Sequence, residues 1–168
     1  RRHEMNQSDR DTIVAIATGS GEGGIGIVRV SGTRAIEIAS PFFKSRTRLE
    51  EAESHKLNFG RFTVGSRDLD QVLASVMKDP HSYTGEDTVE FNCHGGPFLL
   101  RKVVEALVCN GARLAENGEF SKRAFLNGKL DLSQAEAVAD LISCRSDLGL
   151  DSAYFQLRGV LRDAFGRI

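Results

Sequence analysis

Residues 118–137, with the sequence GEFSKRAFLNGKLDLSQAEA, gather charged side chains around a glycine that separates two helical patterns. Lys122, Arg123 and Lys129 supply positive charge there, and Asp131 follows them. Cationic side chains bind anionic groups through charge-assisted hydrogen bonds. A basic, amphipathic turn of this kind favours an anionic ligand over a plain linker.

Two more charged residues fall on predicted strands. In the segment Ile25–Val30, strand alternation puts Arg29 on an apolar face, where a guanidinium needs an acidic partner or an anionic ligand. In Thr88–Cys93, the same alternation separates Glu90 from the apolar side chains. Spacing alone favours an Arg29–Glu90 salt bridge or two solvated side chains, and it leaves a ligand site as the alternative.

The adjacent residues Cys93 and His94 have the residue types of a catalytic thiolate–imidazole pair. Adjacent side chains on a strand point to opposite faces, so this pair is not expected to act as a catalyst. A buried thiol and a loop histidine are predicted instead. The other histidines (His3, His55 and His81) show no metal-ligand spacing, and no metal site is expected.

Nucleotide-binding motifs are weak in this sequence. Gly19, Gly21 and Gly24 match GxGxxG, but a strand-like segment follows them, whereas the dinucleotide motif needs a helix there. The match is therefore interpreted as accidental. The sequence contains no GxxxxGK[ST] phosphate-binding loop.

Periodicity predicts a mixed strand and helix region followed by a helical one. The predicted strands cover residues 12–17, 25–30, 58–64, 70–77 and 88–93, and the predicted helices begin near residues 32 and 97 and end near residues 39 and 111. This pattern indicates an α+β fold with a mixed sheet. We divide the chain into a flexible tail (1–10), a ligand-binding domain (11–125) and the first helices of an incomplete all-α domain (126–168).

The predicted helical region carries an apolar stripe without an evident partner. Ser133 and Glu136 have the spacing of a capping box, and a second stretch of the stripe runs from Leu157 to Ile168. A helix cannot bury such a face alone. Either the chain dimerises through it or the chain is a fragment, and we favour the fragment.

Composition favours a soluble, cytoplasmic protein. The chain has 168 residues, a net charge of −1 and 40% hydrophobic residues, so overall charge gives no general attraction to nucleic acid. The three cysteines lack CxxC spacing and are expected to be free thiols. The sequence has no apolar run near the roughly 20 residues that span a membrane.

Four blocks of sequence carry a resemblance to a known family. They are DTIVAIAT at 11–18, GIGIVRVSG at 24–32, YTGEDTVEFNCHGGP at 83–97, and GEFSKRAFLNGKLDLSQAEAVADLI from residue 118. In this order they resemble the N-terminal region of the MnmE (TrmE) family of tRNA-modification GTPases. They extend over nearly the whole chain after residue 10, and the last two blocks are highly specific.

The resemblance implies an N-terminal domain that is similar to the folate-binding domains of aminomethyltransferase-type proteins. That domain would bind a tetrahydrofolate derivative (5-formyl- or methylene-tetrahydrofolate) and form a homodimer. In the family, a Ras-like G domain binds GTP, magnesium and potassium, and this chain would lack it. With a flavin-dependent partner, MnmG (GidA), the family adds an aminomethyl-type (carboxymethylaminomethyl) group to C5 of the wobble uridine in tRNA.

The family's folate contacts correspond to Arg29, Glu90 and Lys129 of this sequence. A carboxylate such as Glu90 can accept two parallel hydrogen bonds from the guanidine-like edge of a pterin, and either cation suits folate's anionic glutamate tail. No catalytic residue is expected in this segment. Two alternatives remain: a structural dimerisation arm with a degenerate folate pocket, and a stand-alone aminomethyltransferase-like enzyme.

Overall fold

The computed structural model describes residues 11–158, and they divide into two compact units. The sheet unit comprises residues 11–82 and 86–117, and the helical unit comprises residues 83–85 and 118–158. Helix α3 (Glu119–Leu126) therefore belongs as a whole to the helical unit. The sequence-based domain division at residue 125 stays a prediction.

The sheet unit is built on one mixed, seven-stranded sheet, which confirms the predicted α+β class. Its spatial order is β3-β4-β5-β6-β2-β1-β7, and only the β1–β7 pair is parallel. The strands are β1 (Ile13–Ile16), β2 (Gly23–Ser31), β3 (Phe43–Ser45), β4 (Leu57–Val64), β5 (Arg67–Met77), β6 (Thr88–Gly95) and β7 (Arg113–Leu114). All five predicted strands are present, and β3 and β7 are additional.

Alternation along the central strands separates a core face from a second face. On β2, Val28 and Val30 are fully buried, and on β6 the same is true of Val89 and Phe91. Side chains between these positions point the other way because successive strand residues face opposite sides of a sheet. The second face, defined by Ile27, Arg29, Glu90, Asn92, Leu73 and Ser75, therefore carries the predicted charged pair.

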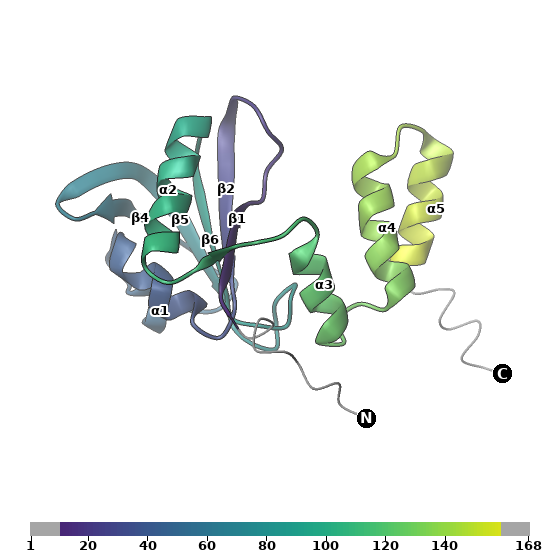
Figure 1. Ribbon diagram of the computed structural model, residues 1–168, viewed down its shortest axis with the longest axis horizontal. Helices are drawn as coiled ribbons and strands as arrows, with labels where there is room; N and C mark the ends of the chain where they lie inside the picture. The colour runs from purple at the N-terminus through teal and green to yellow at the C-terminus, as the bar shows by residue number, and fades with distance from the viewer. Residues whose placement is uncertain (1–10, 159–168) are drawn as a thin grey trace. The chain divides into compact units, whose positions relative to one another are not determined.

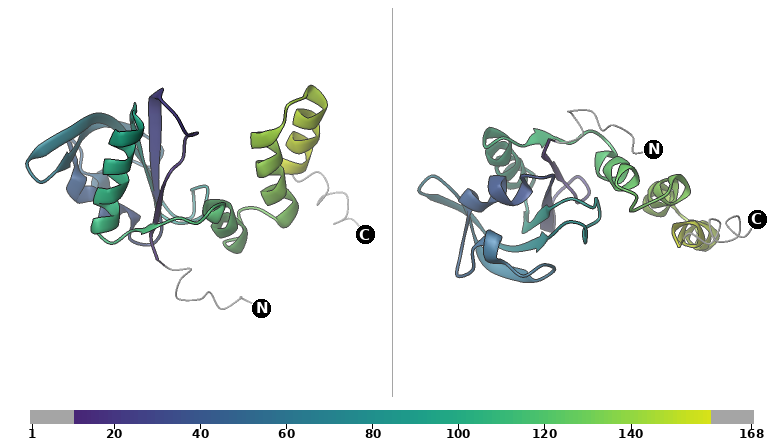
Figure 2. Two further views of the ribbon diagram at one scale, coloured as in Figure 1. Left: turned by 45° about the horizontal axis from the view of Figure 1, so that its top comes forward. Right: turned by 90° about the horizontal axis from the view of Figure 1, so that it is seen from below.

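Helices α1 (Ala35–Ala39) and α2 (Pro97–Cys109) cover the core face, as Figures 1 and 2 show. Proline suits the first turn of α2, where its missing N–H would have no partner in the helix. The helix is amphipathic, and the chain leaves it through Gly111, whose φ of 110° favours glycine. Both predicted helices are thus present, although α1 is shorter than expected. Short 3-10 turns, η2 (Ser40–Phe42) and η3 (Leu49–Glu51), follow α1.

The helical unit contains α3, α4 (Leu132–Ser143) and α5 (Asp147–Leu157). The predicted capping box at Ser133 and Glu136 is wrong, because the cap of α4 lies two residues earlier. Asp131 Oδ1 accepts from the Gln134 backbone N–H at 2.8 Å, and Gln134 Oε1 accepts from the Asp131 N–H at 2.9 Å. Most of the predicted stripe from Leu157 to Ile168 lies outside the described residues.

Residues 83–85 are separated from α3 in sequence but belong to the same unit. Tyr83 Oη and Ser121 Oγ share a hydrogen bond of 2.8 Å, and Asn127 Nδ2 donates to the Thr84 carbonyl at 2.8 Å. Gly85 has a φ of 76°, and a Cβ added there would lie 3.1 Å from a Lys129 side-chain carbon. The YTG segment at residues 83–85 and the block from residue 118 are therefore packed together within the helical unit.

Candidate functional site

Arg29 and Glu90 meet on the second face of the sheet. The two residues are direct cross-strand partners on β2 and β6. Arg29 Nε donates to Glu90 Oε1 at 2.6 Å, and the side chains are 27% and 19% exposed. The salt bridge that spacing favoured is confirmed. Because both groups stay partly open to solvent, the pair is also accessible to a ligand.

The ion pair leaves part of the Glu90 carboxylate available. Among residues 11–158, no group donates a hydrogen bond to Oε2, and Oε1 keeps a second lone pair after bonding Arg29. Arg29 fixes the direction of the carboxylate without occupying both of its oxygens. The arrangement can accept two parallel N–H groups from a planar ligand edge.

The neighbouring positions on the second face are apolar or weakly polar. Ile27 and Asn92 form the next cross-strand pair beside Arg29 and Glu90, and Leu73 pairs with Asn92 from β5. The Asn92 amide donates to the Leu73 carbonyl at 3.2 Å. An aromatic ring bound at Glu90 would therefore find apolar contacts on one side.

Beyond the ion pair, a buried cluster of hydroxyl groups lies at the C-terminal end of β2, two residues after Arg29. Ser31 Oγ donates to Glu86 Oε2 at 2.9 Å, and Thr88 Oγ1 donates to Ser31 Oγ at 3.4 Å. Ser31 and Thr88 are fully buried on the strands that carry Arg29 and Glu90. We did not predict this cluster, although its residues fall within the GIGIVRVSG and YTGEDTVEF blocks.

Lys129, the third predicted site residue, belongs to the helical unit. It is exposed and follows α3 immediately after Gly128, whose φ is 69°. The structure thus brings Arg29 and Glu90 together within one unit, whereas Lys129 is carried by the other. Its assignment to the same ligand stays a prediction.

Two of the charged residues in the 118–137 stretch serve the fold. Arg123 Nη2 donates to Glu119 Oε1 at 3.1 Å, and both side chains are buried within the helical unit. Asp131 caps α4, as described above. Lys122 and Lys129 are the exposed cations of this stretch.

His94 lies at the end of β6 and not in a loop, which corrects the prediction for this residue. Asp70 binds it twice, with Oδ1 2.7 Å from the imidazole Nδ1 and Oδ2 accepting from the His94 backbone N–H at 2.8 Å. The ring is oriented by a carboxylate and remains exposed. Nothing in the sequence indicated Asp70 as its partner.

Cys93 is buried on the core face, as predicted, and burial raises the pKa of its thiol to about 12, with a smaller contribution from Asp70. We expect iodoacetamide at pH 8 to modify the exposed Cys109 quickly and Cys93 only after unfolding, because the thiolate is the nucleophile. Peptide mass spectrometry measures the labelling. Fast modification of native Cys93 would contradict the assigned burial.

The raised pKa also makes stability depend on pH. Between the ordinary pKa of 9.0 and about 12, the Cys93 thiol ionises only in the unfolded chain, so the free energy of unfolding should fall as pH rises.

The remaining sequence motifs add no site. Strand β2 begins at Gly23, so the GxGxxG glycines lead into a strand, as the sequence indicated. Within residues 11–158 there is no group of three or more side chains that could hold a metal ion. None of the helices in this same range is long and apolar enough to cross a membrane.

Comparison with known proteins defines the class to which this fold and site belong. Residues 12–129 match the family described as GTP-binding protein TrmE N-terminus. This range includes Arg29, Glu90 and Lys129. The chain therefore belongs to the MnmE (TrmE) family.

Curated relatives extend the similarity beyond the matched domain. The chain is 55% identical over 161 residues to the tRNA modification GTPase MnmE of Symbiobacterium thermophilum, which covers 94% of this chain and 35% of that protein. It is 52% identical over 157 residues to the protein of the same name from Syntrophotalea carbinolica, covering 93% and 34% of the two chains. For the Clostridioides difficile protein of that name, the identity is 50% over 153 residues, with 90% and 33% covered. The chain thus spans about a third of the length of these relatives.

Proposed function

We propose that this chain is the tetrahydrofolate-binding and dimerising region of a tRNA-modification GTPase. The observation that carries the proposal is the half-buried Arg29–Glu90 pair, in which Arg29 holds one carboxylate oxygen and leaves the other accessible. Family membership supports the reaction class. The proposed pathway is addition of a carboxymethylaminomethyl-type group to wobble uridine in the cytoplasm, together with the flavin-dependent partner MnmG (GidA).

The residues on the second face fit a pterin by the chemistry of their donors and acceptors. Glu90 accepts the guanidine-like N–H edge, and Arg29 positions the carboxylate for it. Ile27 and Leu73 offer apolar contact to the ring, while Asn92 adds an amide beside them. Bound tetrahydrofolate supplies a one-carbon unit, and this chain's own residues bind and orient it.

Lys129 is a separate part of the proposal. Its exposed ammonium suits folate's anionic tail, and the family resemblance assigns it to this ligand. Because it belongs to the helical unit, its contribution needs a variant of its own. GTP hydrolysis with magnesium and potassium belongs to the G domain of the whole protein in this proposal.

The test is isothermal titration of the chain with 5-formyltetrahydrofolate. We expect one specific site per chain, strong weakening by Glu90→Ala, and a smaller loss for Lys129→Ala because an exposed charge contributes less than a half-buried one. Sedimentation velocity at micromolar concentration measures the proposed dimer independently.

Each outcome separates the alternatives. A dimer without heat of folate binding would identify a structural dimerisation arm with a degenerate pocket. A folate-binding monomer would contradict dimerisation while keeping the ligand. Turnover of the bound folate by the chain alone would instead favour a stand-alone aminomethyltransferase-like enzyme.

A further inference from the structure

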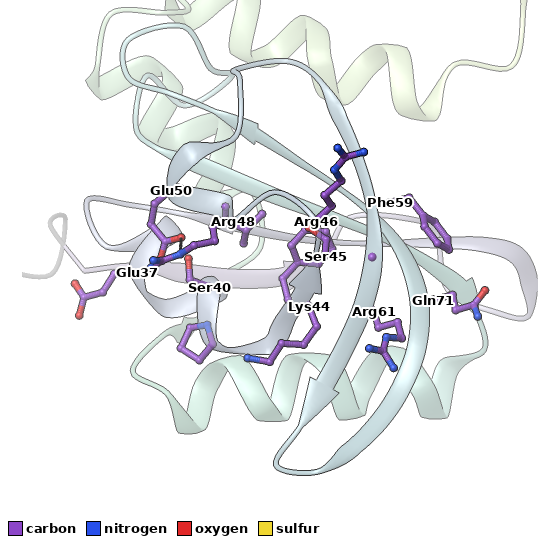
Figure 3. A pocket seen from close by; sticks show the side chains of 14 residues that line it. Glu37, Ser40, Lys44, Ser45, Arg46, Arg48, Glu50, Phe59, Arg61 and Gln71 are labelled. Carbon is purple, nitrogen blue, oxygen red and sulfur yellow. Dashed lines mark ion pairs between the residues drawn. The ribbon is translucent and has the colours of Figure 1, made fainter.

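A concave surface lies at the β3 edge of the sheet unit, away from strands β2 and β6, which carry Arg29 and Glu90. It is a cleft of about 930 Å³, bordered by α1, the turns η2 and η3, β3 and β4. Figure 3 shows its lining side chains. The cleft contains four cationic residues and two carboxylates, in a chain whose net charge is −1. The positive charge is therefore local.

Strand pairing places two of these cations directly opposite each other. Lys44 on β3 pairs with Arg61 on β4, and both are exposed. Like charges at directly opposed positions of a sheet repel each other. An anion bound at Lys44 relieves this repulsion.

Internal ion pairs balance only part of this charge. Arg61 Nη1 lies 2.7 Å from Asp68 Oδ2, and Arg48 Nε lies 3.5 Å from Glu50 Oε2. By contrast, Lys44 and Arg46 form no ion pair with any residue between 11 and 158. These two cations are the ones available to an external anion.

An exposed aromatic ring stands beside the cations. Phe59 lies two residues before Arg61 on β4, so it projects from the same face of the sheet, and it is 66% exposed. Gln71 pairs with Arg61 from β5 and adds an amide to this face. Cations next to a solvent-exposed aromatic ring on a sheet are the combination that binds single-stranded nucleic acid.

We propose that this cleft binds an unpaired stretch of RNA. Lys44 and Arg46 bind backbone phosphates, and an unstacked base lies on the Phe59 ring. A base inside a duplex cannot reach Phe59, so a loop is preferred over a helix. The inference rests on the proposed role in tRNA modification, since that role requires contact with RNA, and it names the surface.

The test is fluorescence anisotropy of this chain with a labelled RNA hairpin that has a seven-nucleotide loop, compared with a blunt RNA duplex. Lys44→Glu/Arg46→Glu is expected to weaken hairpin binding at least tenfold. The matched control, Lys78→Glu/Arg101→Glu, changes net charge equally at exposed positions outside the cleft and is expected to stay within twofold. Phe59→Ala should weaken hairpin binding about tenfold and duplex binding less than twofold, since stacking needs an unpaired base.

Salt dependence supplies a readout that does not depend on a single affinity. Each phosphate contact removed should reduce the slope of log K against log salt by about 0.7 for a single strand, so Lys44→Ala/Arg46→Ala should reduce it by about 1.4. Equal losses in the matched control would overturn the proposal. Unchanged RNA binding by Lys44→Glu/Arg46→Glu would also overturn it. If the sedimentation coefficient of that variant changed at the same time, the surface would be a protein contact. Folate titration of the Lys44 and Arg46 variants distinguishes failure of this site from failure of the Arg29–Glu90 site.

Discussion

Replacing Arg123 with alanine is expected to destabilise the helical unit by about 3 kcal/mol. Arg123 and Glu119 are 3% and 7% exposed and form an i,i+4 ion pair on α3. The substitution breaks this buried ion pair, and breaking such a pair by removing one partner costs about 3–5 kcal/mol. The cost lies at the lower end of this range because Glu119 is the first residue of α3, where the helix dipole favours a negative charge.

Hydrogen exchange with mass spectrometry measures this loss of stability separately for the helical unit and the sheet unit. Peptides covering α3 and α4 should lose protection, while peptides from β5 and β6 should keep it, because the two units need not unfold together. Lys122→Ala is the matched control, since Lys122 is exposed on the same helix. A change below 0.5 kcal/mol is expected for it.

A double variant tests the physical reason. In Glu119→Gln/Arg123→Met, neither buried charge remains, so part of the lost protection should return. If the stability lost in the double variant equals the sum of the losses in Glu119→Gln alone and Arg123→Met alone, the two side chains are not coupled. Arg123 would then act through packing of its alkyl chain and not through Glu119.

Alternation along β2 and β6 was enough to separate Arg29 from Val28 and Val30 and Glu90 from Val89 and Phe91, but it did not show which face of β2 forms the core. The apolar residues that alternate with them along each strand are fully buried, so the sequence pattern and the packing agree. Strand pairing was not available from the same pattern, because alternation gives the face of a side chain and not its cross-strand neighbour. Spacing therefore favoured a salt bridge without being able to choose it over two solvated side chains.

Short elements and remote partners escaped prediction for different reasons. Strand β3 has three residues, too few to show a period, yet its pairing with β4 creates the opposed Lys44 and Arg61. The cap of α4 was misplaced because two overlapping segments fit the capping pattern, and the structure uses the one that begins at Asp131. Asp70 binds His94 from a strand 24 residues away, and no local pattern encodes such a contact.

Replacing Glu90 with glutamine is expected to weaken binding of 5-formyltetrahydrofolate at least 100-fold, or about 2.7 kcal/mol. Glutamine keeps the shape of glutamate, but it removes the charge and turns one of the two acceptors into a donor. That donor would then face the N–H edge of the pterin. Isothermal titration measures the affinity. The free energy of unfolding, measured by thermal denaturation, should change by less than about 1 kcal/mol because the ion pair is only half-buried.

Arg29 provides the matching test of positioning. Arg29→Ala should weaken folate binding about tenfold, because Glu90 stays but loses the bond that orients it, and Arg29→Lys should recover part of this loss by donating to the same oxygen. In the Glu90→Gln background, Arg29→Ala should have little further effect, since the oriented carboxylate is already gone.

Glu105→Gln is the matched control for Glu90→Gln. It removes one negative charge from an exposed carboxylate on α2. If Glu90→Gln binds within threefold of the unchanged chain, the carboxylate does not meet the pterin. The Arg29–Glu90 pair would then be a structural link between β2 and β6.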